Sequence, residues 1–306
     1  MRKIAAIGEC MVELASDATG RDVRMTGFAG DTCNSAVYLR RLLDTQFEVS
    51  YVTSIGTDRL STQMLAFLSD EGINTDLVHR NGQRTVGIYL IENDLKGDRR
   101  FIYWRDRSAA RTLLDAETQF DLSPLLACEL ILVSAILPAV MPAAARDRFL
   151  EFLGAYRAAG GCIAFDSNYR PQLWESVAVA RAFVARMHSI ADIALPSLDD
   201  ELALFGDADE AAAIARLRSY GARQLVIKRG ARGPFVVSGL ASEVNAELTM
   251  RDDNVAVIDA TGAGDAFNAG YLAARICGES MSAAALAGHR LAVRVIGQRG
   301  AILPRV

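Results

Sequence analysis

The segment with the richest chemistry lies near the end of the chain, where residues 259–270 read Asp-Ala-Thr-Gly-Ala-Gly-Asp-Ala-Phe-Asn-Ala-Gly. It follows an apolar run from Val255 to Ile258, which we predict to be a strand, and it opens an apolar helix. Gly262, Ala263 and Gly264 carry little or no side chain, so backbone N–H groups at the helix start can converge on a phosphate. The helix dipole favours the same negative charge. The spacing therefore predicts an anion hole.

Asp265 comes directly after this turn, where its carboxylate can accept a proton from an attacking hydroxyl. Taken alone, Gly-x-Gly-Asp is equally compatible with an ordinary acidic residue in a first helical turn. A dinucleotide-binding loop is disfavoured because Phe267 stands where that fingerprint needs glycine. A Walker A loop is excluded because none of the three lysines lies in a Gly-Lys-Ser/Thr sequence. The segment thus indicates phosphoryl transfer of another design.

A second segment, Ala29-Gly30-Asp31-Thr32-Cys33-Asn34, precedes a run of helical periodicity from Ser35 to Leu43. Gly30 permits close approach of the backbone to a ligand, and Asn34 offers both a donor and an acceptor to sugar hydroxyls. As an isolated feature this would more often be an ordinary helix cap.

Together the two segments resemble the signatures of the ribokinase-like (PfkB) carbohydrate kinases. The second signature, Asp-Thr-Thr-Gly-Ala-Gly-Asp, is matched by residues 259–265 except at Ala260, and the first, Gly-Gly-x-x-x-Asn, is matched except at Ala29. Further similarities run in family order from Ile7 to Ile302. The resemblance implies an ATP-dependent sugar kinase with Asp265 as general base. It also implies an α/β, ribokinase-like three-layer fold with a mainly parallel sheet and a small β-sheet lid.

The same resemblance assigns residues to the nucleotide and to metal ions. Ser197 and Asp200 replace the Asn and Glu of the family's Asn-x-x-Glu segment, which is linked to phosphate and Mg²⁺. The residues implied beside the nucleotide are Ser197, Lys228, Gly230, Gly233, Gly262, Gly264 and His289, the last in the segment Ala287 to Arg299 that closes the adenine pocket. Asp259 and Thr261 are implied for a monovalent cation such as K⁺.

Other segments are similar to family members that phosphorylate a sugar acid, 2-dehydro-3-deoxygluconate, at its terminal hydroxyl to give 2-dehydro-3-deoxy-6-phosphogluconate. They include Phe101-Ile102-Tyr103-Trp104-Arg105 and the stretch from Asp166 to Trp174. A carboxylate calls for guanidinium groups that a neutral hexose does not need. The sugar site implied comprises Gly30, Asp31, Asn34, Tyr89, Tyr103, Arg105 and Arg170. Without the resemblance, any one of these arginines or tyrosines would be read as solvated or half-buried surface.

Three alternatives stay open or are disfavoured. A kinase of the same family for fructose or a nucleoside would keep Asp265 and the glycine turn but would not need two arginines. A non-catalytic sugar-binding regulator would be expected to lose the base or the glycines, and both are present. A nucleotide-dependent oxidoreductase is disfavoured by Phe267.

These residues need a scaffold, and the pattern from about residue 120 onward predicts strand-helix-strand units and a buried, mainly parallel sheet. We predict strands at Leu130 to Ile136, Cys162 to Phe165, Ile190 to Leu195 and Gln224 to Lys228, and helices at Ala143 to Ala159, Val177 to His188 and Glu210 to Tyr220. Val86 to Glu92 and Arg100 to Trp104 are β-prone and separated by turn residues, which favours a hairpin. We expect one domain over residues 1–306, with a lid formed by insertions at roughly 10–30 and 86–112.

Composition limits the classes of partner. Of 306 residues, 51% are hydrophobic and 23% charged, and the net charge is −4, so neither disorder nor a nucleic-acid or membrane-surface partner is indicated. Five dispersed cysteines form no C-x-x-C pair, and the first apolar run is too short for a signal peptide. We therefore expect a cytoplasmic protein with reduced thiols whose partners are a sugar acid and ATP. The sequence leaves a homo-oligomer open.

Overall fold

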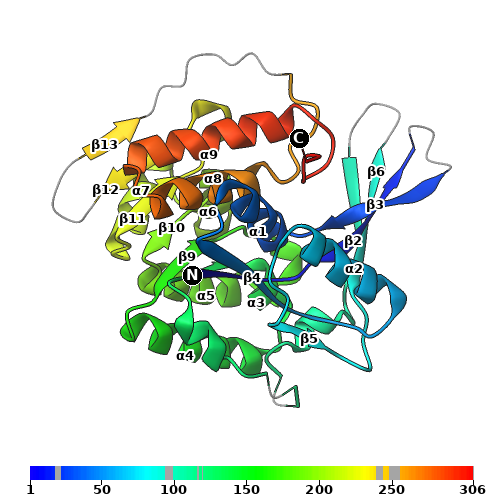
Figure 1. The fold of residues 1–306 in the computed structure, drawn as a ribbon. Helices are drawn as coiled ribbons and strands as arrows, with labels where there is room; N and C mark the ends of the chain where they lie inside the picture. The colour runs from blue at the N-terminus through cyan, green and yellow to red at the C-terminus, as the bar shows by residue number, and fades with distance from the viewer. Residues whose placement is uncertain are drawn as a thin grey trace.

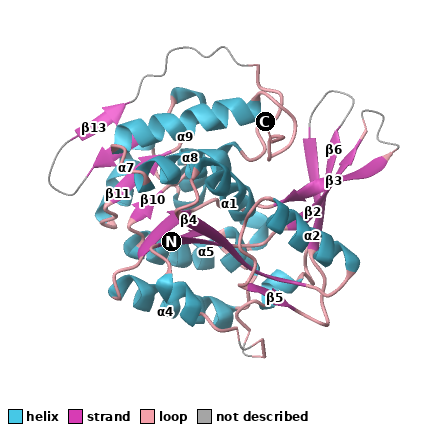
Figure 2. Ribbon diagram, in the orientation of Figure 1, coloured by secondary structure: helices cyan, strands magenta, loops and turns pink. Residues whose placement is uncertain are grey.

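The computed structural model describes residues 1–17, 22–93, 99–115, 117–118, 120–238, 244–247 and 256–305. Helices surround a large sheet, and a second, smaller sheet stands beside them (Figure 2). The predicted α/β class with a mainly parallel central sheet is confirmed. None of the helices in these ranges is long and apolar enough to cross a membrane.

The central sheet has nine strands in the order β13-β12-β11-β10-β9-β8-β1-β4-β5. They are β1 (Arg2–Ile7), β4 (Phe47–Ile55), β5 (Val78–Arg80), β8 (Leu130–Ser134), β9 (Cys162–Asp166), β10 (Ile193–Ala194), β11 (Gln224–Ile227), β12 (Phe235–Ser238) and β13 (Val244–Glu247). The strands from β11 to β5 pair in parallel, and β12 and β13 extend one edge in antiparallel pairing. The parallel strands are almost wholly buried, as expected for a sheet covered on both faces.

Helices cover both faces of this sheet (Figure 1). One face carries α1 (Asp31–Leu42), α8 (Ala263–Ile276) and α9 (Met281–Ile296), whose apolar side chains form one large core cluster with β1 and β4. The other face carries α4 (Ala143–Ala158) and α5 (Val177–Ile190), which pack on β8 and β9 in a second cluster. The remaining helices are α2 (Arg59–Asp70), α3 (Ile136–Val140), α6 (Leu198–Phe205) and α7 (Glu210–Ser219). The result is three layers.

Most predicted elements are confirmed within two residues, and the exceptions have local causes. The strand predicted to reach Ile136 ends at Ser134, because Ile136 opens α3. Of the strand predicted at Ile190 to Leu195, only Ile193–Ala194 pairs in the sheet, because α5 continues to Ile190.

The strand predicted before the glycine turn is wrong over residues 256–258, which are irregular; Val255 lies outside the described residues. The backbone N–H of Ile258 donates to the Ile296 carbonyl at the end of α9, with an N···O distance of 2.8 Å. Residues 256–258 therefore approach the glycine turn alongside the end of α9 and do not form a strand of the central sheet.

The small sheet has the order β3-β2-β6-β7 and projects from the helical body (Figure 1). Its strands are β2 (Met11–Ser16), β3 (Val23–Ala29), β6 (Gly87–Asn93) and β7 (Arg99–Trp104). The predicted hairpin is confirmed by the antiparallel pairing of β6 with β7, and its connection, residues 94–98, lies outside the described residues. All four strands come from the two segments that we expected to form a lid.

Two glycines let α8 and α9 approach closely. A Cβ atom added to Gly288 would lie 2.6 Å from the Phe267 carbonyl oxygen, and one added to Gly270 would lie 2.8 Å from the Gly288 Cα atom. Both neighbours are backbone, which cannot rotate away. This contact fixes the axis of α8, whose first turn carries Asp265.

We predict that Gly288→Ala destabilises the protein by about 1–3 kcal/mol through overpacking, and that it lowers the melting temperature by several degrees. Gly154→Ala in α4 is the matched control, because no atom would lie within 4 Å of the added Cβ. The control should stabilise by roughly 0.5–1 kcal/mol, since alanine is the better helix former. Equal melting temperatures for the two variants would contradict the proposed packing constraint.

Candidate active site

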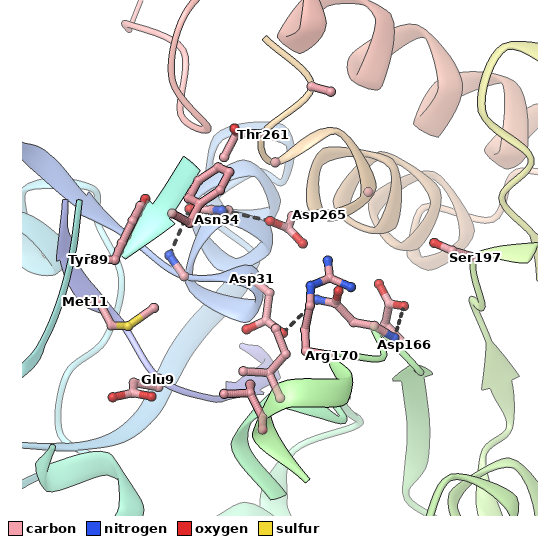
Figure 3. Close-up of a pocket in the computed structure, with 18 of the residues that line it drawn as sticks. Glu9, Met11, Asp31, Asn34, Tyr89, Asp166, Arg170, Ser197, Thr261 and Asp265 are labelled. Carbon is pink, nitrogen blue, oxygen red and sulfur yellow. Dashed lines mark hydrogen bonds between the residues drawn. The ribbon is translucent and has the colours of Figure 1, made fainter. Parts of the chain in front are cut away.

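A cavity of about 730 Å³ opens where the parallel strands end. In open α/β sheets, ligands bind at the carboxyl ends of the strands. Residues following β1, β9, β10 and β11 line the cavity together with the first turns of α1 and α8, and the small sheet supplies the opposite wall (Figure 3). The lining residues that we predicted are Gly30, Asp31, Asn34, Tyr89, Tyr103, Arg105, Arg170, Ser197, Asp200, Lys228, Asp259, Thr261, Gly262, Gly264 and Asp265.

Asp265 lies in the first turn of α8 and faces the first turn of α1 (Figure 3). The Asn34 side-chain amide donates to Asp265 Oδ2 at 2.8 Å, and the Ser35 hydroxyl donates to the Asp265 backbone carbonyl at 3.0 Å. Burial and, to a smaller extent, the nearby Asp31 carboxylate raise the pKa of Asp265 to about 8, although the Asn34 hydrogen bond opposes the shift. A carboxylate with a pKa near neutrality is suited to proton transfer.

Asp31 is the second carboxyl group at this point of the cavity. Its Oδ2 accepts hydrogen bonds from the Ser134 hydroxyl and from the Asn168 amide, the latter at 3.1 Å. Burial raises the pKa of Asp31, although the hydrogen bonds from the Ser134 hydroxyl and the Thr32 N–H oppose the shift. Its oxygens are thus engaged by the protein, whereas Asp265 accepts one side-chain amide.

The glycine turn adopts a conformation that needs glycine at one position. Gly262 has φ of +77°, and a Cβ atom there would lie 2.8 Å from the Ala301 Cβ atom. The Ala263 N–H donates to the Ala260 carbonyl at 3.3 Å, and Ala263 does not line the cavity. The predicted anion hole at the start of α8 would therefore have to use the amides that follow, those of Gly264 and Asp265.

Of the residues that the resemblance assigned to the nucleotide, only some line the cavity. Ser197 and Lys228 face one another across an isolated parallel bridge, and both line the cavity with Asp200. Gly230, Gly233 and His289 are absent from the lining that the described residues form. Gly230 and Gly233 have positive φ in a short turn after β11, and His289 lies half-buried on α9.

Asp259 and Thr261 close the loop before α8. Asp259 Oδ1 accepts the Thr261 N–H at 2.9 Å, and Oδ2 accepts the Gly300 N–H at 2.7 Å. Among the residues that the structure describes, no group of three His, Cys, Asp or Glu side chains could hold a metal ion. The carboxylate at 259 thus joins the turn to the C-terminal segment, and the cation assigned there stays a prediction.

Arg105, which we assigned to the sugar site, already has a carboxylate partner within the protein. Its guanidinium donates from Nε to Glu9 Oε2 at 3.0 Å and also from Nη2, with both side chains at most 5% exposed. Arg170 differs, because its side chain is 43% exposed and lies 3.5 Å from Asp200 Oδ1. Arg170 is therefore the cation best placed to turn toward a ligand.

The two tyrosines lie directly opposite one another in the β6–β7 pair, with ring centroids 6.0 Å apart. The Tyr89 hydroxyl donates to Glu13 Oε2, so toward a ligand it can only accept. Tyr103 is 41% exposed and lines the cavity. The two rings therefore share one face of the β6–β7 pair.

Sequence reasoning missed three polar residues in or next to the cavity. Glu9 follows β1 and Asp166 ends β9, and both line the cavity; Asn268, one turn after Asp265 on α8, lies outside the lining and donates to Asp166. Each is at most 3% exposed. The signal that could have found Asp166 is its position directly after the predicted parallel strand Cys162 to Phe165, whereas the strand before Glu9 was not predicted.

We predict that Asp265→Asn stabilises the protein progressively as the pH rises from 4 to 8. A carboxyl group with a raised folded-state pKa weakens the fold as it ionises, between its unfolded pKa near 4 and its folded value of about 8. The asparagine variant should gain on the order of 5 °C over wild type across this range in thermal melts. The control Asp199→Asn, an exposed neighbour in α6, should give a difference that does not change with pH. A constant difference for the Asp265 variant would contradict the raised pKa.

Comparison with known proteins identifies the family to which the chain is similar. The model of the pfkB family carbohydrate kinases matches residues 1–306. The chain is 41% identical over 307 residues to 2-dehydro-3-deoxygluconokinase of Escherichia coli strain K12, covering 99% of this chain and 98% of that protein. It is 36% identical to the protein of the same name from Haemophilus influenzae, covering 100% and 97%.

Solved structures agree with the fold. A putative ribokinase II from E. coli in complex with ATP and Mg²⁺ superposes with a TM-score of 0.85 at 21% identity, over 99% of this chain and 95% of that one. The 2-dehydro-3-deoxygluconokinase of Thermotoga maritima superposes with a TM-score of 0.79 at 19% identity, over 99% and 96%. The chain belongs to the pfkB family of carbohydrate kinases.

Proposed function

We propose that the protein transfers the γ-phosphoryl group of ATP to the terminal hydroxyl of 2-dehydro-3-deoxygluconate, giving 2-dehydro-3-deoxy-6-phosphogluconate. The observation that carries the proposal is full-length identity of 36–41% to kinases named for this substrate. The cavity supports it, because a half-buried carboxylate lies in the first turn of a helix at the ends of the parallel strands.

In this proposal Asp265 accepts the proton of the sugar hydroxyl. The oxygen then attacks the γ-phosphorus, the bond to the bridging oxygen breaks, and ADP leaves with the electron pair. The Asn34 amide orients the carboxylate through the 2.8 Å hydrogen bond. The amides of Gly264 and Asp265 stabilise the charge on the transferring group, because they lie at the positive end of α8.

The sugar would lie against the small sheet, with its carboxylate toward Arg170. Tyr103 and the first turn of α1 would complete the sugar wall, and Arg105 would line it while held by Glu9. Closing of the small sheet over the sugar would exclude water that could otherwise hydrolyse ATP.

ATP would enter from the side of Ser197 and Lys228. Mg²⁺ in phosphoryl-transfer sites takes one or two carboxylates, phosphate oxygens and water. Asp200 fits this role, because burial raises its pKa and a cation would relieve the cost of its charge. Bound there, Mg²⁺ would supply positive charge to the phosphate oxygens. Asp259 and Thr261 remain our candidates for a monovalent cation.

A neutral-sugar kinase is the second candidate, and the Glu9–Arg105 pair is the observation that favours it. Because Glu9 already neutralises Arg105, only Arg170 of the two arginines favours a substrate with a carboxylate. Relatives named fructokinase are 27–29% identical to this chain over 89% of its length. Discrimination then depends on Arg170.

Replacing the base should stop phosphoryl transfer without unfolding the protein. We predict that Asp265→Asn lowers kcat by roughly 10²-fold or more while the apparent affinities for ATP and sugar change little. ADP release in a coupled assay measures the loss, with Asp199→Asn as the control that should keep wild-type turnover. Near-wild-type turnover of the Asp265 variant would remove the assignment of the base.

The substrate is tested by one panel of acceptors with one pair of variants. We predict that 2-dehydro-3-deoxygluconate exceeds fructose and ribose by roughly 10²-fold or more in kcat/KM, since the closed site is built for a charged hydrogen bond. Arg170→Ala should lose most of this preference, whereas Arg186→Ala, an exposed residue of α5, should keep it. If fructose matched the acid in the wild type, the kinase assignment would stand and the named substrate would fall.

A further inference from the structure

Three separate elements bring Asp166, Lys228 and Asn268 together beside the anion-hole turn. The Lys228 ammonium lies 2.5 Å from Asp166 Oδ2 and 3.2 Å from Asn268 Oδ1. The Asn268 amide also donates to Asp166 Oδ2 at 2.6 Å. These residues come from the end of β9, the loop after β11 and the second turn of α8. The three side chains therefore hold one another in a closed triangle.

The ammonium is directed at the turn that carries the anion hole. A Cβ atom added to Gly264 would lie 3.6 Å from Lys228 Nζ, which is ordinary contact distance. Lys228 and Gly264 line the same cavity as Asp265. The glycine thus leaves the backbone amides and the ammonium side by side, with no side chain of residue 264 between them.

An ammonium group has three N–H donors, and the two bonds within the triangle use two of them. The lysine side chain is 10% exposed and lines the cavity, so its third N–H can donate to a ligand there. A buried lysine–carboxylate pair is costly to desolvate and is weak as a device for stability alone. Its position is better explained by an anion that it meets during the reaction.

We propose that Lys228 is a catalytic residue that donates to a γ-phosphoryl oxygen during transfer, and that Asp166 and Asn268 are positioning residues for its ammonium. The inference rests on the proposed kinase reaction. The bond from the sugar oxygen to phosphorus forms, the bond to the bridging oxygen breaks, and the hydroxyl proton goes to Asp265. Lys228 keeps its proton throughout. Its ammonium acts as a compact positive charge beside the phosphoryl oxygen.

The decisive variant is Lys228→Gln, whose side-chain amide can still donate to Asp166 but carries no charge. We expect kcat to fall about 10²-fold or more, with KM for the sugar within about threefold of wild type. Lys228→Arg should recover at least about tenfold of the loss, because it restores the charge. Asp166→Asn should lower kcat by about tenfold, since it loosens the position of Lys228. Lys3→Met, at the exposed start of β1, is the matched control and should leave kcat unchanged.

A purely structural triangle gives a different result. It would lower the melting temperature of Lys228→Gln and Lys228→Arg alike, with kcat per folded molecule within about fivefold of wild type, and that outcome overturns the inference. A loss confined to KM for ATP would also overturn it, because the lysine would then only bind nucleotide. The assay uses whichever sugar the wild type phosphorylates. A wrong substrate assignment would therefore show in the wild-type acceptor panel, and it would not change the ratio of variant to wild-type kcat. A wild type that phosphorylates no sugar contradicts both proposals.

Discussion

The site is built around a carboxylate that the fold withdraws in part from water. Asp265 is half-buried beside Asp31 and Asp166; its burial, and then the charge of these two neighbours, raise its pKa. Such a group is expensive, because a buried charge without a full set of partners destabilises the folded state. The surrounding structure must therefore fix it, and the contacts of α8 do so on two sides. Asn34 and Ser35 hold its first turn to α1, and the glycine contact with α9 sets its axis.

Three pairs of opposite charge also line the cavity. Glu9 neutralises Arg105, Asp166 neutralises Lys228, and Asp200 lies near Arg170 at the more open side. The first two pairs are buried and geometrically tight, while the third is longer and exposed. Pairing lowers the cost of burying these charges but does not remove it. An anionic substrate is therefore expected to engage the loosest pair first, and this singles out Arg170 among the arginines.

The sequence was informative where function depends on a short local motif. The glycine turn and Asp265 occupy the predicted helix start, because a helix N-terminus is encoded within a few residues; Asn34 lies in the first turn of α1, which begins at Asp31, four residues before the predicted start at Ser35. It was uninformative where partners are distant in the chain. Glu9 and Arg105 are 96 positions apart, and Asp166 and Lys228 are 62 apart, so only the pairing of strands brings them together. The irregular residues 256–258 illustrate another limit, since an apolar run can pack against a helix end as readily as in a sheet.

The central claim is that Asp265 acts as the base from a site that raises its pKa. The most direct measurement is the pH dependence of kcat/KM for the sugar in the wild-type enzyme, because this ratio reports ionisations of the free enzyme. The account predicts a limb that rises tenfold per pH unit and levels off near pH 8, where the Asp265 carboxyl ionises. A profile that is flat from pH 5 to pH 8 would contradict it.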